Sequence, residues 1–202
     1  MAQDIAHEEV KKAVYPFFFP LGRLLSHFNV QPVTFTIGGL IASFFSFLFL
    51  VSGSLFWASI MILVTELNDI VDGLLARYAK KESRFGAFID STIDRYAEGF
   101  IYLGLLVFFW EKSLIISLFI LLAFIGSILV SYTRARAEGV GFFCRFGLMK
   151  RKIRMAVLFI SILVASFISQ GEIVLGSTII TLAILCHFTA LQRILYVRKQ
   201  SI

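Results

Sequence analysis

Four aspartates stand in two pairs near the middle of a strongly apolar chain. Asp69 and Asp72 are three residues apart, and Asp90 and Asp94 are four residues apart. On a helix, spacings of three and four place side chains on the same face, so each pair points in one direction. Carboxylate oxygens are the ligands that hard cations such as Mg²⁺, Mn²⁺ or Ca²⁺ prefer. The two pairs therefore predict a divalent-metal site wherever the fold brings these helix faces together.

Zinc does not suit this set of residues. No histidine or cysteine stands near the aspartates, and Cys144 and Cys186 lie far apart without a metal-type spacing. We interpret both cysteines as unreactive thiols. An aspartate at membrane depth costs about 2.5–3.5 kcal/mol on insertion scales. Four like charges also repel one another, and a bound divalent cation is the simplest relief.

The elements that must position the aspartates are those of an all-α membrane protein. The chain has 202 residues, of which 58% are hydrophobic and 16% charged, whereas about a quarter of a soluble domain is charged. The length and the lack of internal repeats indicate one domain, residues 1–202. A net charge of +6 in so apolar a chain indicates cytoplasmic loops beside anionic head groups, rather than nucleic-acid binding.

Six transmembrane helices are expected within residues 33–197, because about 20 apolar residues cross a bilayer. Four segments are uncharged: Val33–Gly53, Leu114–Thr133, Met155–Gly171 and Val174–Gln192. Two further segments contain the aspartates: Ser54–Thr65 with its continuation to Arg77, and Phe85–Glu98 with its continuation to Trp110. Residues 1–32 are expected to form a juxtamembrane segment with an interfacial helix, since the polar start carries no signal peptide.

The basic residues define the orientation. All of the 19 lysines and arginines except Lys112 and Arg95 fall at the termini or in the connections 77–86 and 134–154. The positive-inside rule therefore places both termini in the cytoplasm of a multi-pass cell-membrane protein. The aspartates then lie at the cytoplasmic ends of their spans. The short link 78–86 is expected to make these two helices antiparallel neighbours, so that the four carboxylates meet.

The aspartates belong to a longer motif. The chain reads Asp69-x-x-Asp72-Gly73-x-x-Ala76-Arg77, then eight residues, then Gly86-x-x-x-Asp90-x-x-x-Asp94. This stretch resembles the signature of the CDP-alcohol phosphotransferases, and every signature position is filled at its spacing. The resemblance implies six spans with the motif at the cytoplasmic ends of the second and third. It also implies a membrane enzyme that moves a phospho-alcohol from a CDP-alcohol to a second alcohol and releases CMP.

The resemblance assigns a role to each motif residue. Asp69, Asp72, Asp90 and Asp94 are expected to hold two Mg²⁺ or Mn²⁺ ions. Asp94 is also the expected general base, which takes the proton of the acceptor hydroxyl. The donor is expected to be CDP-diacylglycerol or CDP-archaeol. The residues expected to bind it are Gln31, Pro32, Val33, Thr34, Gly73, Ala76, Arg77, Ser83 and Gly86.

Several segments, including Ser131–Gly139 and Gln192-Arg193, further resemble the prokaryotic phosphatidylinositol-phosphate synthases. That branch uses an inositol phosphate acceptor, and the matching acceptor-phosphate residues here are Arg134, Arg154 and Arg193. The topology puts all three at the inner ends of spans four to six, where guanidinium groups suit a phosphate. Homodimers are common in the family, so a homodimer is one expectation.

Two alternatives remain at this stage. The run Lys150-Arg151-Lys152-Ile153 is more basic than the Glu-Arg-Pro-Glu of the inositol branch. Glycerol 3-phosphate is therefore an alternative acceptor, which would make the protein a phosphatidylglycerol-phosphate synthase. A cation or proton transporter is the alternative from a different class. A transporter needs polar groups along its whole path, and the first span has none that are charged.

Overall fold

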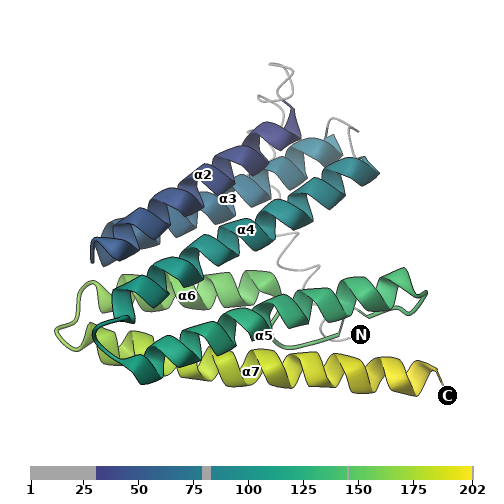
Figure 1. Cartoon of the computed structure of the whole chain (residues 1–202). Helices are drawn as coiled ribbons and strands as arrows, with labels where there is room; N and C mark the ends of the chain where they lie inside the picture. The colour runs from purple at the N-terminus through teal and green to yellow at the C-terminus, as the bar shows by residue number, and fades with distance from the viewer. Residues whose placement is uncertain (1–30, 79–82, 145, 202) are drawn as a thin grey trace.

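The computed structural model describes residues 31–78, 83–144 and 146–201, and the expected interfacial helix before residue 31 lies outside this range. The described residues are helical except for short connections, which confirms the all-α fold class (Figure 1). The helices are α2 (Pro32–Val51), α3 (Leu55–Tyr78), α4 (Arg84–Phe109), α5 (Leu114–Gly139), α6 (Arg151–Ala165) and α7 (Gly171–Gln200).

The helices form two groups of three. In the first group α2 packs against both α3 and α4, and in the second α7 packs against both α5 and α6. The two groups meet where α3 contacts α6 and where α4 contacts α5. Successive helices run in opposite directions, so the aspartate ends of α3 and α4 lie at the same end of the molecule, on the right in Figure 1.

The two aspartate helices run in opposite directions, as expected, and their carboxylates meet, but their backbones are not in close contact. Among the described residues α3 and α4 hardly touch each other, because α2 packs closely on both. Small residues allow this approach. A Cβ on Gly104 of α4 would lie 2.8 Å from the Leu50 side chain of α2. Similarly, Thr65 of α3 donates a hydrogen bond to the Gly39 carbonyl of α2 at 3.2 Å. Because α3 and α4 each pack on α2 rather than on each other, side chains occupy the space between them.

Local signals set several helix ends. Pro32 occupies the first turn of α2, where its missing N–H is not needed. Ser83 caps α4 by accepting a hydrogen bond from the Gly86 N–H at 2.9 Å. The expected span Met155–Gly171 is wrong in its bounds, because α6 begins at Arg151 and the helix ends at Ala165. Residues 166–170 form the connection, in which the Ser166 hydroxyl donates to the Leu163 carbonyl at 2.6 Å.

Three of the described helices are long and apolar enough to cross a membrane by length and composition: Val33–Val51, Leu114–Gly139 and Gly171–Gln200. Helices α3 and α4 have 24 and 26 residues but carry the acidic side chains. Helix α6 has only 15 residues. The main apolar core lies toward the end away from the aspartates and joins both groups, with Ile62, Leu105, Ile120, Leu158 and Ile179 almost fully enclosed.

Candidate metal centre and active site

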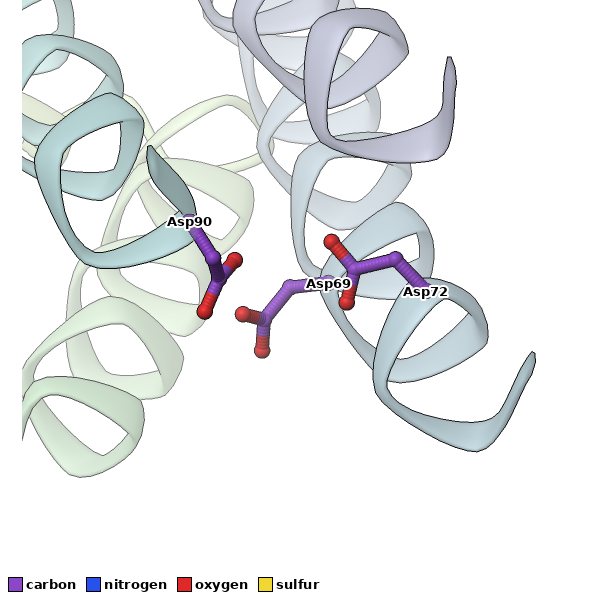
Figure 2. Close-up of side chains that lie close together, drawn as sticks. All are labelled: Asp69, Asp72 and Asp90. Atoms are coloured by element: carbon purple, nitrogen blue, oxygen red, sulfur yellow. The ribbon is translucent and has the colours of Figure 1, made fainter. Parts of the chain in front are cut away.

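Three aspartates converge between α3 and α4. One carboxylate oxygen from each of Asp69, Asp72 and Asp90 lies within 4.8 Å of the others. Figure 2 shows Asp69 and Asp72 on α3 and Asp90 on α4, with the Asp69 and Asp90 carboxylates facing each other across the space between the helices. Asp72 is buried and the other two are half-buried. A group of three carboxylates at this spacing suits a hard divalent cation.

The surroundings of these carboxylates fit a metal ion. Thr36 of α2 donates a hydrogen bond to Oδ2 of Asp72 at 2.8 Å, which fixes the orientation of that carboxylate. Oδ2 of Asp69 is buried and makes no hydrogen bond among the described residues, although the Lys152 ammonium lies 3.2 Å away. Buried carboxylate oxygens without a hydrogen bond are uncommon in proteins, and a metal ion would satisfy this one.

Asp94 lies one turn beyond Asp90 on α4 and lines the same small pocket as the other three aspartates. It lies outside the three-carboxylate group, and two arginines pair with it. Nη2 of Arg151 lies 2.8 Å from Oδ1 of Asp94, and Nη2 of Arg95 lies 3.6 Å from Oδ2. The fourth aspartate of the motif is therefore beside the metal centre, paired with cations from α6 and from its own helix.

Sequence analysis gave Arg151 no role at this site. As the first residue of α6, it also lies 3.3 Å from Oδ1 of Asp69 and 3.3 Å from Oε1 of Glu66. An arginine guanidinium stays charged in proteins. Arg151 is therefore a permanent cation at the edge of the metal centre. The basic run Lys150–Lys152 is the signal in the sequence that could have indicated this cation.

The centre as a whole carries excess negative charge. Five carboxylates gather here, and three cations face them: Arg151, Lys152 and Arg95. The Nζ of Lys152 lies 3.2 Å from Oδ2 of Asp69. The five carboxylates are those of Glu66, Asp69, Asp72, Asp90 and Asp94. Like charges this close disfavour their ionised forms unless further positive charge arrives. Divalent ions would supply that charge.

A second charged cluster lies one turn deeper and is closed. Glu98 is fully buried and accepts hydrogen bonds from Arg154 Nε and Nη2, at 3.0 and 3.1 Å, and from Ser127 at 2.5 Å. Arg154 is also fully buried, and its Nη1 donates to the Met149 carbonyl at 2.7 Å. The guanidinium that sequence analysis expected to bind the acceptor phosphate is therefore enclosed by protein partners.

The other two expected acceptor arginines are placed differently. Arg193 is buried and donates to the Phe146 carbonyl at 2.7 Å and to the Val130 carbonyl. Arg134 is exposed and pairs with Glu138 at 2.9 Å. The three arginines thus sit at the expected helix ends without sharing one open surface, and their assignment to the acceptor stays a prediction.

The expected donor-binding residues lie on both sides of the centre. Gln31 precedes α2 and its carbonyl accepts from the Thr34 N–H at 3.0 Å; Val33 is half-buried. Gly73 and Ala76 follow Asp72 along α3 and are half-buried, as is Gly86, while Ser83 is exposed at the start of α4. The side chains of Pro32 and Arg77 lie outside the described residues. These assignments also stay predictions.

Comparison with known proteins decides the family. Residues 29–190 match the family model described as CDP-alcohol phosphatidyltransferase. The chain belongs to the CDP-alcohol phosphatidyltransferase family. The resemblance seen in the motif is thereby confirmed, and the protein is a transferase.

Relatives narrow the branch of the family. A phosphatidylinositol phosphate synthase of Streptomyces avermitilis is 31% identical, over 90% of this chain and 78% of the relative. An archaetidylinositol phosphate synthase of Methanothermobacter thermautotrophicus is 34% identical, over 72% of each chain. The crystal structure of Mycobacterium tuberculosis phosphatidylinositol phosphate synthase with CDP-DAG bound has a TM-score of 0.81 and 29% identity, covering 88% of this chain and 92% of that one.

A divalent cofactor is also confirmed. A second crystal structure of the Mycobacterium tuberculosis enzyme, with a TM-score of 0.81 and 28% identity, is in complex with manganese and citrate. In the present transferase Asp69, Asp72 and Asp90 form a cluster able to hold such an ion. The number of ions stays a prediction.

Proposed function

We propose that this transferase moves the phosphatidyl or archaetidyl group of a CDP-alcohol to the hydroxyl of inositol phosphate and releases CMP. The convergence of Asp69, Asp72 and Asp90 in the family motif carries the proposal. The relatives named phosphatidylinositol and archaetidylinositol phosphate synthases support this acceptor.

The protein is placed across the cell membrane six times, with both termini and the active site on the cytoplasmic side. Three apolar helices, and two more of comparable length, support this placement. Helix α6 has 15 residues and spans about 22 Å at 1.5 Å per residue, less than the roughly 30 Å hydrocarbon layer. Because helix α6 does not reach across the whole layer, its basic start lies inside the membrane, deeper than the inner head groups.

The metal centre is assigned to the donor. Asp69, Asp72, Asp90 and Asp94 would together hold two divalent ions. Bound divalent ions would neutralise the pyrophosphate and stabilise the leaving CMP. Thr36 keeps the Asp72 carboxylate oriented toward the ion through its 2.8 Å hydrogen bond. The nucleotide is assigned to the nine donor residues named above, of which Gly73, Ala76 and Gly86 lack bulk, so that a flat base can approach the helices.

Asp94 is assigned as the general base. Its carboxylate takes the proton of the acceptor hydroxyl, and the resulting oxygen attacks the β-phosphorus of the donor as the bond to CMP breaks. Arg134, Arg154 and Arg193 are assigned to the acceptor phosphate. Because Glu98 encloses Arg154, we assign that arginine a contribution through its electric field rather than through direct contact. Arg151 and Lys152 are the cations that a phosphate would meet in the pocket of the aspartates.

The test is CMP release by the purified, lipid-reconstituted protein supplied with CDP-diacylglycerol. We expect release to need Mg²⁺ or Mn²⁺, to stop with EDTA, and to be faster with inositol 1-phosphate than with inositol or glycerol 3-phosphate. A preference for glycerol 3-phosphate would establish the alternative acceptor. Absence of CMP release with every acceptor, together with ion flux across the vesicles, would favour the transporter.

A further inference from the structure

The closed cluster around Glu98 lies directly beneath the proposed base. Glu98 follows Asp94 by four residues on α4, so both carboxylates lie on the same helix face. Glu98 is fully buried, and hydrogen bonds from Arg154 and Ser127 occupy its oxygens. It cannot contact a substrate, yet it is connected to Asp94 by two routes.

The first route runs through Arg95. Its Nη1 lies 3.5 Å from Oε2 of Glu98, and its Nη2 lies 3.6 Å from Oδ2 of Asp94. Nη1 also donates a hydrogen bond to Ser131 of α5. One planar guanidinium is therefore held at one end by Glu98 and Ser131, and its other end faces Asp94.

The second route runs through α6. Arg154 is bound to Glu98 and donates to the Met149 carbonyl at 2.7 Å, so it fixes the segment that leads into α6. Arg151 begins this helix one turn before Arg154, and its Nη2 lies 2.8 Å from Oδ1 of Asp94. The position of Glu98 thus sets the position of the second cation at Asp94.

Stability gives little reason to keep such a pair. Taking two charges out of water has a large desolvation cost, and well-packed apolar residues often replace a buried ion pair without loss of stability. The Glu98–Arg154 pair is completely buried. Both partners of Glu98, Arg95 and Arg154, instead connect it to the partly buried carboxylate of Asp94, which indicates a role in arranging that carboxylate.

We propose that Glu98 is a positioning residue that, through Arg95 and Arg154, places the two cations flanking Asp94 and so fixes the geometry of the proposed base. The proposal rests on the proposed function, because it takes Asp94 to accept a proton from the acceptor. It assigns Glu98 no contact with substrate or metal.

The test compares Glu98→Gln with the double variant Glu98→Gln/Arg154→Met. The single variant leaves Arg154 buried without its counter-charge, so both Tm and kcat fall. The double variant removes both charges, and its Tm recovers toward that of the wild type. Its kcat stays about 10²-fold low, the loss expected from a misplacement of about 1 Å, while the KM for CDP-diacylglycerol and the Kd for Mn²⁺ are unchanged.

Recovery of kcat together with Tm in the double variant would overturn the proposal, because the pair would then be only structural. Leu158→Ala, a fully buried apolar residue of the same helix, is the matched control and lowers Tm without changing kcat at the assay temperature. If the double variant does not fold, Arg95→Gln decides, since Arg95 is partly exposed. A low kcat with unchanged Tm supports the proposal, and wild-type kcat refutes it.

Failure of the proposed function looks different. In that case the wild-type protein releases no CMP from CDP-diacylglycerol with any acceptor, whatever the variants do. If only the positioning proposal fails, the wild-type protein still releases CMP. The double variant then recovers its kcat, and Arg95→Gln has the kcat of the wild type. The Tm values and the Mn²⁺ affinity, measured by electron paramagnetic resonance, report on the cluster independently of turnover.

Discussion

The metal centre and the Glu98 cluster are neighbours on α4 that use the same residue types and balance their charges in opposite ways. In the metal centre five carboxylates face three cations, Arg151, Lys152 and Arg95, and the buried Oδ2 of Asp69 has no hydrogen bond from the described residues. In the inner cluster a single carboxylate, Glu98, faces Arg95 and Arg154 and accepts from Ser127.

The difference teaches how to distinguish a binding site from a structural ion pair. A carboxylate whose oxygens are all satisfied by protein donors has no capacity left for a ligand. A cluster with more acids than internal cations is stable only when a further cation arrives, or when some of its acids take up protons. Four predictions test this distinction, from the largest effect to the smallest.

Asp90→Asn should abolish most turnover. It removes one of the three converging ligands, and loss of several kcal/mol of transition-state stabilisation corresponds to at least about 10³-fold in kcat. Mn²⁺ titration of the purified protein should show much weaker binding. The matched inner variant Glu98→Gln should keep the Mn²⁺ affinity of the wild type. Equal loss of Mn²⁺ binding in both variants would contradict the view that the metal centre binds the ion and that the Glu98 cluster does not.

Asp94→Asn should lower kcat by about 10²-fold, the lower part of the range for general base catalysis. Because Asp94 lies outside the group of three carboxylates, Mn²⁺ binding should be retained in part. Steady-state kinetics and Mn²⁺ titration of one preparation check both points. A wild-type rate in this variant would refute the assignment of the base.

Arg193→Ala should raise the KM for the acceptor by about tenfold, since a hydrogen bond to a charged group is worth about 1.5–3 kcal/mol. The KM for the CDP-alcohol should change much less. Arg134→Ala is the exposed comparison, and Tm separates loss of packing from loss of binding because Arg193 is buried. Equal effects on both KM values would contradict a role at the acceptor phosphate.

Arg151→Gln should tighten Mn²⁺ binding by about fivefold, because it removes a cation that repels the metal ion. Two charges about 4 Å apart repel each other by about 1 kcal/mol when water screens them. The turnover of this variant should nevertheless fall, since Arg151 also holds Asp94. Lys152→Gln is the control and should change the affinity less, because that side chain is 62% exposed. Weaker Mn²⁺ binding in Arg151→Gln would show that the arginine supports the site rather than competing with the ion.

The sequence predicted the parts of the site that depend on local spacing. The intervals between Asp69, Asp72 and Asp90 follow from helix periodicity and the family motif, and these carboxylates converge. The packing of α2 against both aspartate helices could not be predicted, because it depends on how closely Gly39 and Gly104 let the backbones approach. A short link between two helices predicts their direction but not their direct contact.

The ion pairs were the other part that the sequence could not predict. Glu98 and Arg154 are 56 residues apart in the chain, and their pairing depends on the way in which α4 and α6 cross. Arg151 and Arg154 are one turn apart in the same basic run, yet one reaches the metal centre and the other is sealed inside. The charge composition of a helix end does not show which of its arginines will line a site and which will be buried.

The shortness of α6 has a consequence for the route of the reactants. Figure 1 shows α5 and α7 extending past the start of α6 at the aspartate end. Among the described residues no side-chain hydrogen bond caps α6 at Lys150. The positive end of the helix dipole lies at the level of Asp94, which Arg151 contacts. The positive end of this helix dipole would thus attract the phosphate of a water-soluble sugar phosphate toward Asp94. In the proposed membrane placement, the lipid headgroup and its acceptor would meet there, beneath the membrane surface, without the lipid tails leaving the bilayer.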